Sequence, residues 1–338
     1  MQKSLLALLA FLSFLGCLPL ADNQSTPTFD LQPPVLEKVL TTEATTICLQ
    51  FNKEAFLSSQ EIEFQPALSL KETRDGDKVL TIALSAAMQI GQEYSLKLTV
   101  QDKNGNTNTV LARFYGHNPS IPRLLLNEFT TQGSTTHPDL VELKILSDGN
   151  MGGLTFYHGT KTSFAYRFIF PAFDVKAGDF ILIHVKPQNI PAEVDETTAK
   201  TISGGLDASP TAFDFWVRDG SGLSGNNGII AVYTQPEGEI IDAVIYSNRS
   251  SDSDSNYRGF GSKNFMEQAD ELVASGGWQP ALSLIRPEDA INPDPSTATR
   301  SICRASSGVD TDTKSDFHIV PTKKSSFGAE NCDEVYEP

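Results

Sequence analysis

Short runs in which apolar and polar residues alternate recur along this chain, and they constrain its fold more than any other feature. In residues 45–51, 80–84 and 94–100, every second side chain is apolar. A two-residue period is typical of antiparallel β-strands that bury one face, and polar turns such as 74–77 separate the runs. No amphipathic helical pattern interrupts them. The alternation therefore predicts about seven short strands in a small β-sandwich.

Similar runs continue beyond Ile121-Pro122-Arg123, which separates the chain into two parts. At 338 residues the chain is long enough for two domains that each bury a core. Further strands are predicted at 124–129, 139–146, 154–157, 180–185, 229–233 and 240–246.

The motifs of residues 33–117 follow an order that resembles bacterial Ig-like domains. A Phe-Asn-Lys step at 51–53 ends one run, Gly-Gln-Glu-Tyr at 91–94 begins another, and Asp-Lys-Asn-Gly-Asn at 102–106 precedes the last. Asn-Gly tolerates positive φ and closes a tight hairpin. The resemblance implies a spacer or interaction module. Asp102, Asn104 and Asn106 also carry oxygen atoms that suit calcium, but a plain turn is the preferred interpretation.

Residues 120–333 resemble the lamin-tail domain, a compact Ig-like β-sandwich found in bacterial exported proteins and in nuclear lamins. The motifs are Leu-Asn-Glu-Phe at 126–129, Asp-Leu-Val-Glu-Leu at 139–143, Gly-Leu at 153–154, the hairpin 238–246, and the closing segments 300–317 and 321–331.

Two stretches exceed a minimal domain of this type, and the sequence predicts that they are long surface loops. They are residues 187–225 and 247–298, with a short helix near 264–274. The predicted fold class is therefore all-β, with two Ig-like β-sandwich domains in tandem, the second enlarged by long loops.

The N-terminus has the pattern of an export signal. Its apolar run, 5–15, has the length of a signal h-region and is shorter than the ~20 residues of a membrane span. Ser-Phe-Leu-Gly-Cys at 13–17 resembles a bacterial lipobox in relaxed form. The resemblance implies a signal peptide at 1–16 and acyl chains such as palmitate on Cys17, followed by a flexible tether at 17–32. An ordinary secreted protein is the alternative.

The formal net charge is −16, and it becomes −17 when Lys3 leaves with the leader, because −16 minus +1 is −17. An acidic surface disfavours nucleic acid, whose phosphates need basic patches. It equally disfavours polybasic adhesion to anionic lipid, whereas divalent cations are a partner class that it would favour.

Four cysteines are present, and three remain if Cys17 is acylated. Cys303 and Cys332 lie in the same C-terminal segment and form a candidate disulfide in an oxidising compartment. Cys48 lies within an alternating run and is interpreted as a small structural residue.

Two acidic groups suggest ion binding, but neither has a complete motif. Residues 252–256 alternate oxygen-bearing side chains, yet Tyr257 and Lys263 occupy the positions where an EF-hand needs Gly and Glu. A second group contains Asp310, Asp312 and Asp316, and is interpreted as a turn before a buried Phe. No metal ligand and no cofactor are predicted.

No nucleophile elbow, Walker loop or zinc spacing is present. Glu128 and Glu142 lie on neighbouring predicted strands and could face one another, with a hydrogen-bonded structural pair as the preferred interpretation. Trp216 and Trp278 are interpreted as core residues, and His184 as structural. The other histidines are His117, His137, His158 and His318.

The sequence thus predicts a non-enzymatic, lipid-anchored protein of a bacterial cell envelope, located at the cell surface, outer membrane or periplasmic face. Its expected partners are the membrane, through the lipid, and an unidentified protein or envelope polymer, with no nucleic acid. Two alternatives stay open. One is a hydrolase of envelope carbohydrate with its site in loops 187–225 and 247–298, and the other is a calcium-dependent adhesin.

Overall fold

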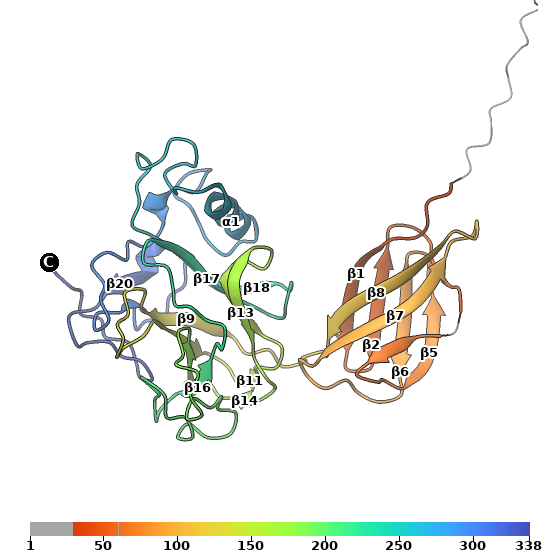
Figure 1. Cartoon of the computed structure of the whole chain (residues 1–338), viewed down its shortest axis with the longest axis horizontal. Coiled ribbons are helices and arrows are strands. Elements are labelled where there is room, and N and C mark those ends of the chain that lie inside the picture. Colours follow the sequence, from red (N-terminus) through yellow and green to blue (C-terminus); the bar gives the residue numbers. More distant parts are fainter. Residues whose placement is uncertain (1–29, 60) are drawn as a thin grey trace, which may run out of the picture.

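The computed structural model describes residues 30–59 and 61–338, and the chain forms two lobes (Figure 1). We call residues 30–117 the N-terminal lobe and residues 118–338 the C-terminal lobe. The predicted signal peptide, Cys17 and residues 17–29 of the predicted tether lie outside the described residues. The all-β prediction is confirmed, since strands account for 35% of the chain and helices for 6%.

Two antiparallel sheets pack around one core in the N-terminal lobe. The alternating runs bury their apolar side as predicted, with Ile47, Leu49 and Phe51 fully buried. One sheet has the order β1-β2-β6-β5, formed by β1 (Leu36–Glu43), β2 (Thr46–Phe51), β6 (Val79–Leu84) and β5 (Leu70–Asp75). The other contains β3 (Phe56–Leu57), β7 (Glu93–Gln101), β4 (Glu63–Gln65) and β8 (Thr107–Tyr115).

The C-terminal lobe has a larger core between a six-stranded and a four-stranded sheet. The six-stranded sheet has the order β16 (Phe213–Trp216), β15 (Phe180–His184), β10 (Leu140–Ile145), β9 (Leu124–Phe129), β19 (Ile302–Arg304) and β20 (Phe317–Ile319). The four-stranded sheet has the order β13 (Phe164–Ile169), β12 (Thr155–Gly159), β17 (Asn227–Tyr233) and β18 (Ile240–Ser247), and a small sheet pairs β11 (Gly149–Asn150) with β14 (Asp174–Val175).

The predicted long loops are present with one exception. Residues 213–216, expected in the first loop, form the edge strand β16, which pairs in parallel with β15. The second loop contains the predicted helix, α1 (Lys263–Ala274), and the 3-10 helix η1 (Pro287–Asp289), while η2 (Lys314–Asp316) precedes β20. Helix α1 begins where the Ser262 side chain accepts a hydrogen bond from the Phe265 amide, and its Phe265, Ala269 and Leu272 side chains are buried.

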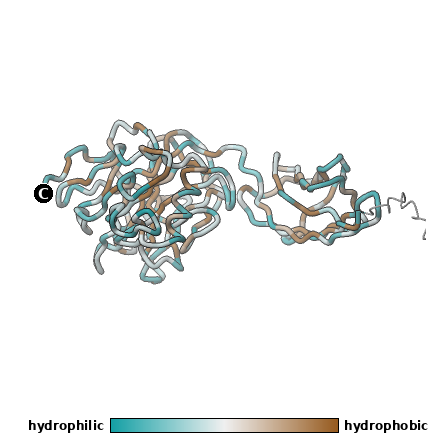
Figure 2. Tube along the Cα trace, turned by 90° about the horizontal axis from the view of Figure 1, so that it is seen from above, coloured by the Kyte–Doolittle hydropathy of each residue, from teal (hydrophilic) through white to brown (hydrophobic). Residues whose placement is uncertain are grey.

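The two lobes meet through close backbone contacts. A Cβ atom on Gly91 would lie 2.2 Å from the Gly153 nitrogen, so the backbones approach more closely than any larger residue permits. A Cβ atom on Gly152 would likewise lie 2.8 Å from the Ile90 side chain of the N-terminal lobe. Figure 2 shows an elongated molecule with hydrophobic segments gathered inside each lobe.

No helix among residues 30–59 and 61–338 is long and apolar enough to cross a membrane.

Candidate functional site

Most of the candidate functional side chains lie on the outer face of the six-stranded sheet. This face is turned away from core residues such as Val141 and Leu143. Strand registration places a row of side chains across all of its strands, because each member is the pairing partner of the next. The row runs Asp214, Leu182, Glu142, Glu128, Cys303 and His318. The segments 187–211 and 320–338 supply residues that contact this face.

Glu128 and Glu142 face one another in register, and both are 0% exposed. Glu128 accepts hydrogen bonds from the Ser301 hydroxyl and from the amide and hydroxyl of Ser326, the latter two at 2.9 and 2.7 Å. Glu142 accepts from the Asn127 side chain at 2.6 Å and from the Gly328 amide at 2.5 Å. The two carboxyl groups therefore hold the C-terminal segment against the sheet, in line with the structural pair preferred from the sequence.

Burial is the main cause that raises the pKa of both carboxyl groups, and for Glu142 the neighbouring Glu128 raises the pKa further, well above its ordinary value. Hydrogen bonds from Ser301 and Ser326 partly oppose this effect at Glu128. Close carboxyl groups with raised pKa values are a feature of some acid–base sites, but these two are covered by residues 326–328.

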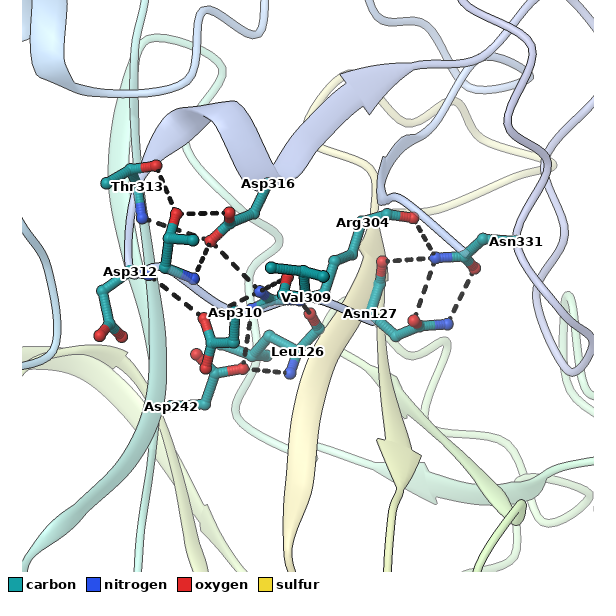
Figure 3. Close-up of polar contacts among 11 residues, drawn as sticks. Leu126, Asn127, Asp242, Arg304, Val309, Asp310, Asp312, Thr313, Asp316 and Asn331 are labelled. Carbon is teal, nitrogen blue, oxygen red and sulfur yellow. Dashed lines mark hydrogen bonds and ion pairs between the residues drawn. The ribbon is translucent and has the colours of Figure 1, made fainter. Parts of the chain in front are cut away.

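Beside this pair, Arg304 is the centre of a buried ion cluster (Figure 3). The Arg304 side chain is 1% exposed and forms ion pairs with Asp242 at 3.1 Å, Asp310 at 2.9 Å and Asp316 at 3.4 Å. Its Nε atom also donates to the Leu126 carbonyl at 3.1 Å. The cluster thereby joins β9, β18 and β19 to the loop before β20.

Sequence reasoning found the acidic residues of that loop but missed Arg304 and Asp242. The signal was present, because Asp242 interrupts an apolar run and charged residues are rarely buried unless they are paired. Burial raises the pKa of Asp242 to about 7, an effect that the Arg304 guanidinium opposes and the Asp310 charge reinforces.

At the other end of the sheet, the Asp214 carboxylate accepts a hydrogen bond from the His184 ring, with 2.7 Å between Nε2 and Oδ1. Its ring stacks on Trp216, with ring centroids 3.7 Å apart. The Trp216 indole N–H donates to the Ser203 hydroxyl at 2.9 Å, and the Ser209 amide donates to Asp214 at 2.9 Å. These contacts fix the long loop on the sheet, as expected for a structural His184. Trp216 and Trp278 are both buried, as predicted.

The candidate disulfide between Cys303 and Cys332 is not formed in this structure, where both are free thiols. The reason is orientation. The Cys332 carbonyl oxygen, which lies 2.8 Å from His318 Nε2, faces the Cys303 thiol at 3.6 Å. Burial raises the pKa of the Cys303 thiol, so it stays protonated. Cys48 is also free, on β2.

The two suggested calcium loops at 102–106 and 252–256 form turns. Asp102 accepts hydrogen bonds from the amides of Asn104 and Asn106, and it forms an ion pair with Lys53. The Asn106 side-chain hydrogen bond is the largest of the causes that lower the pKa of Asp102 to about 2. Asp254 accepts in the same way from the Asn256 amide at 2.8 Å.

A hollow of ≈ 400 Å³ opens on the outer face, between residues 207–210 and 323–327. Leu140 and Leu182 line it, and Phe327 of the C-terminal segment packs against the same apolar cluster. His137 and Asp207, whose side chains are hydrogen-bonded at 2.9 Å, line it together with Lys323. The hollow thus combines apolar side chains with polar and charged ones.

Comparison with known proteins gives a family but no activity. An uncharacterized protein of Treponema pallidum (strain Nichols) is 30% identical over 159 residues, which are 47% of this chain and 40% of that protein. The chain thus spans less than half of that relative's length.

Among solved structures, L,D-transpeptidase 3 from Mycobacterium tuberculosis, in complex with a faropenem-derived adduct, is similar at a TM-score of 0.17 and 10% identity, covering 44% of this chain and 80% of that one. An L,D-transpeptidase from Mycobacterium tuberculosis H37Rv has the same TM-score and identity, covering 55% and 90%. Likeness at this level carries no argument. The model of the family TP_1001_2nd, described as "protein second domain", matches residues 122–319, and the chain belongs to this family.

Proposed function

We propose that this protein is a non-enzymatic binding protein of the bacterial cell envelope, anchored to a membrane by lipid on Cys17. The C-terminal lobe, with its sequence resemblance to lamin-tail domains, contacts a protein or an envelope polymer. The N-terminal lobe, which resembles bacterial Ig-like domains, acts as a spacer between the membrane and that contact.

The observation that carries the proposal is the covered carboxylate pair. A glycoside hydrolase places two carboxyl groups on either side of an accessible sugar linkage. Here Glu128 and Glu142 are 0% exposed, and their oxygens accept hydrogen bonds from Ser326 and Gly328. Their chemistry is used to fasten the C-terminal segment, which supports a structural and binding role over hydrolysis.

The hollow next to that segment supplies the contact surface. Its apolar floor of Leu140 and Leu182 and its charged residues Asp207 and Lys323 suit a short polar chain with an apolar face, such as a peptide loop or a segment of envelope polymer. Residues on loops that rest on a rigid sheet commonly carry binding.

Binding is tested with the mature protein lacking Cys17, added to isolated cell-wall polymer and, separately, to solubilised envelope proteins. We expect Ala208→Trp, which fills the hollow, and Lys323→Glu, which inverts a lining charge, to reduce co-sedimentation or capture about tenfold. Lys263→Glu on α1, whose side chain is 70% exposed, is the matched control and retains binding. Equal binding by all variants, or none by the unaltered protein, contradicts the proposal.

The anchor is tested separately by metabolic labelling with a palmitate analogue. The unaltered protein should incorporate label and sediment with membranes, whereas Cys17→Ala should do neither. Equal labelling of the two proteins would show that Cys17 is not the lipid site, whatever the C-terminal lobe binds.

A further inference from the structure

We propose that the C-terminal lobe binds a divalent cation of the calcium type between the carboxylates of Asp242, Asp310 and Asp312. The three come from two distant parts of the chain. Asp242 lies on β18, and Asp310 and Asp312 lie on the loop that precedes η2.

The spacing of the oxygens suits calcium. One carboxylate oxygen from each residue lies within 4.8 Å of the others. Calcium holds oxygen ligands at about 2.3–2.6 Å, so two oxygens on one ion are at most about 5 Å apart. Magnesium usually keeps several waters and is bound through one or two carboxylates, whereas this group offers three. An all-carboxylate set also favours a hard cation over zinc, which is usually bound by nitrogen and sulfur.

The second observation is an unpartnered oxygen at the centre of the group. Asp242 is 2% exposed, and its Oδ2 atom accepts from the Leu126 amide and from Arg304. Its Oδ1 atom is buried without a hydrogen-bond partner among the described residues. Figure 3 shows the carboxylate of Asp242 beside that of Asp310. A buried carboxylate oxygen without a donor is unfavourable, and a bound cation would satisfy it.

The excess of negative charge around Arg304 also favours a bound cation. Arg304 forms ion pairs with Asp242, Asp310 and Asp316, so one positive charge already faces three carboxylates. Asp312 adds a fourth, and burial followed by the charges of Asp310 and Asp316 raises its pKa. A divalent cation would compensate most of this excess charge.

The site is also reachable from solvent. The Asp310 side chain is 32% exposed, so water can complete the six to eight oxygen ligands that calcium takes. Asp310 and Arg304 are joined through Oδ1, which leaves the other Asp310 oxygen for the ion. A dissociation constant of about 10⁻⁴–10⁻³ M is typical of extracellular calcium modules.

The experiment uses the mature protein after treatment with EDTA, with calorimetric titration of CaCl₂ and thermal unfolding followed by tryptophan fluorescence. At a dissociation constant near 1 mM, 10 mM CaCl₂ should raise the melting temperature by about 3–6 °C. NaCl of equal ionic strength should not. Asp312→Asn keeps the side-chain shape at the rim of the cluster and should weaken binding about tenfold. Asp252→Asn, in an exposed acidic loop, is the control and should respond as the unaltered protein does.

Equal melting temperatures in CaCl₂ and EDTA would overturn the proposal. A calcium response of the same size in Asp312→Asn would overturn it as well. An equal response to MgCl₂ would contradict the calcium type.

Discussion

The two lobes of this protein are both built from β-strands, but they treat charged side chains in different ways. Among the described residues of the N-terminal lobe, one charged residue is buried, Asp102 in a turn. The C-terminal lobe buries several, including Glu128, Glu142, Asp242 and Arg304. In the N-terminal lobe, hydrophobic alternation accounts for the packing. In the C-terminal lobe, buried polar groups also fasten long segments that have no regular pairing of their own. The first lobe should therefore tolerate charge removal, and the second should not.

The largest expected effect follows from removing Arg304. Arg304→Met leaves Asp242, Asp310 and Asp316 without their common cation, and loss of one partner of a buried ion pair typically costs about 3–5 kcal/mol. Urea unfolding followed by tryptophan fluorescence measures this, because Trp216 and Trp278 are the chain's two tryptophans and both lie in the C-terminal lobe.

The matched change in the N-terminal lobe is Lys53→Met, which removes a partly exposed partner of Asp102 and Asp30. Hydrogen exchange of β2 and β6 should change little. A loss of protection comparable with that in the C-terminal lobe of Arg304→Met would erase the contrast between the lobes.

Two glycines with positive φ, one in each lobe, differ in how closely their surroundings are packed. Gly328 has φ +79°, and a Cβ there would lie 2.5 Å from Ser209 Oγ and 2.6 Å from Thr211 Oγ1. Gly105 has φ +82°, with nothing within 4 Å of the added atom. Both substitutions by alanine carry the backbone cost of about 1 kcal/mol, but Gly328→Ala adds a clash and disturbs the hydrogen bond to Glu142.

We therefore expect Gly328→Ala to lower the free energy of unfolding by about 2–3 kcal/mol and Gly105→Ala by about 1 kcal/mol. Chemical unfolding of the two variants measures the difference. Similar losses would mean that the C-terminal segment is not held tightly against residues 209–211.

The pH dependence of stability should have opposite signs in the two lobes. The folded pKa of Glu142 is raised, so its contribution is complete below the unfolded pKa, near 4.5, and is lost as the pH rises through the folded pKa. The folded pKa of Asp102 is lowered to about 2, so its contribution is present above about 3.8 and is lost as the pH falls toward 2.

Tryptophan-detected unfolding from pH 5 to pH 9 should therefore show a C-terminal lobe that weakens as the pH rises. Glu142→Gln, which does not titrate, should reduce this slope, and the remainder comes from other buried carboxyl groups with raised pKa values, such as Asp242. Hydrogen exchange of β7 and β8 should instead show the N-terminal lobe weakening only in acid. A slope unaffected by Glu142→Gln would assign the pH dependence to another group.

The same difference explains how much the sequence could predict. Local alternation was sufficient for the strands at 45–51, 80–84 and 94–100, because the pattern along a strand decides which face is buried. Strand β16 was missed because it has four residues and pairs in parallel with β15, and neither property leaves a local period.

The candidate sites show the same limit. Neighbouring strands were enough to suggest that Glu128 faces Glu142. The Arg304–Asp242 pair joins residues 62 positions apart, and nothing local specifies it. That Cys303 and Cys332 lie in the same C-terminal segment does not specify which atom of Cys332 contacts the Cys303 thiol. The path of the last segment determines this, and it brings the carbonyl oxygen there.

The smallest effect is expected for surface ion pairs, where the two lobes should again differ in their sensitivity to the loss of a charge. Lys97 bonds Glu63 at 2.9 Å, with the two side chains 52% and 69% exposed, so solvent screens the pair. Lys144 pairs with Glu330 at 2.5 Å, is 16% exposed and lies 6.0 Å from the centre of the Phe180 ring. Lys97→Met should leave stability unchanged within error, whereas Lys144→Met should lower the free energy of unfolding by up to about 1 kcal/mol. Glu330 lies on the segment held by Glu128 and Glu142, so hydrogen exchange in residues 320–331 should rise in Lys144→Met alone. A rise in neither variant would mean that the buried carboxyl groups hold this segment without help from the surface.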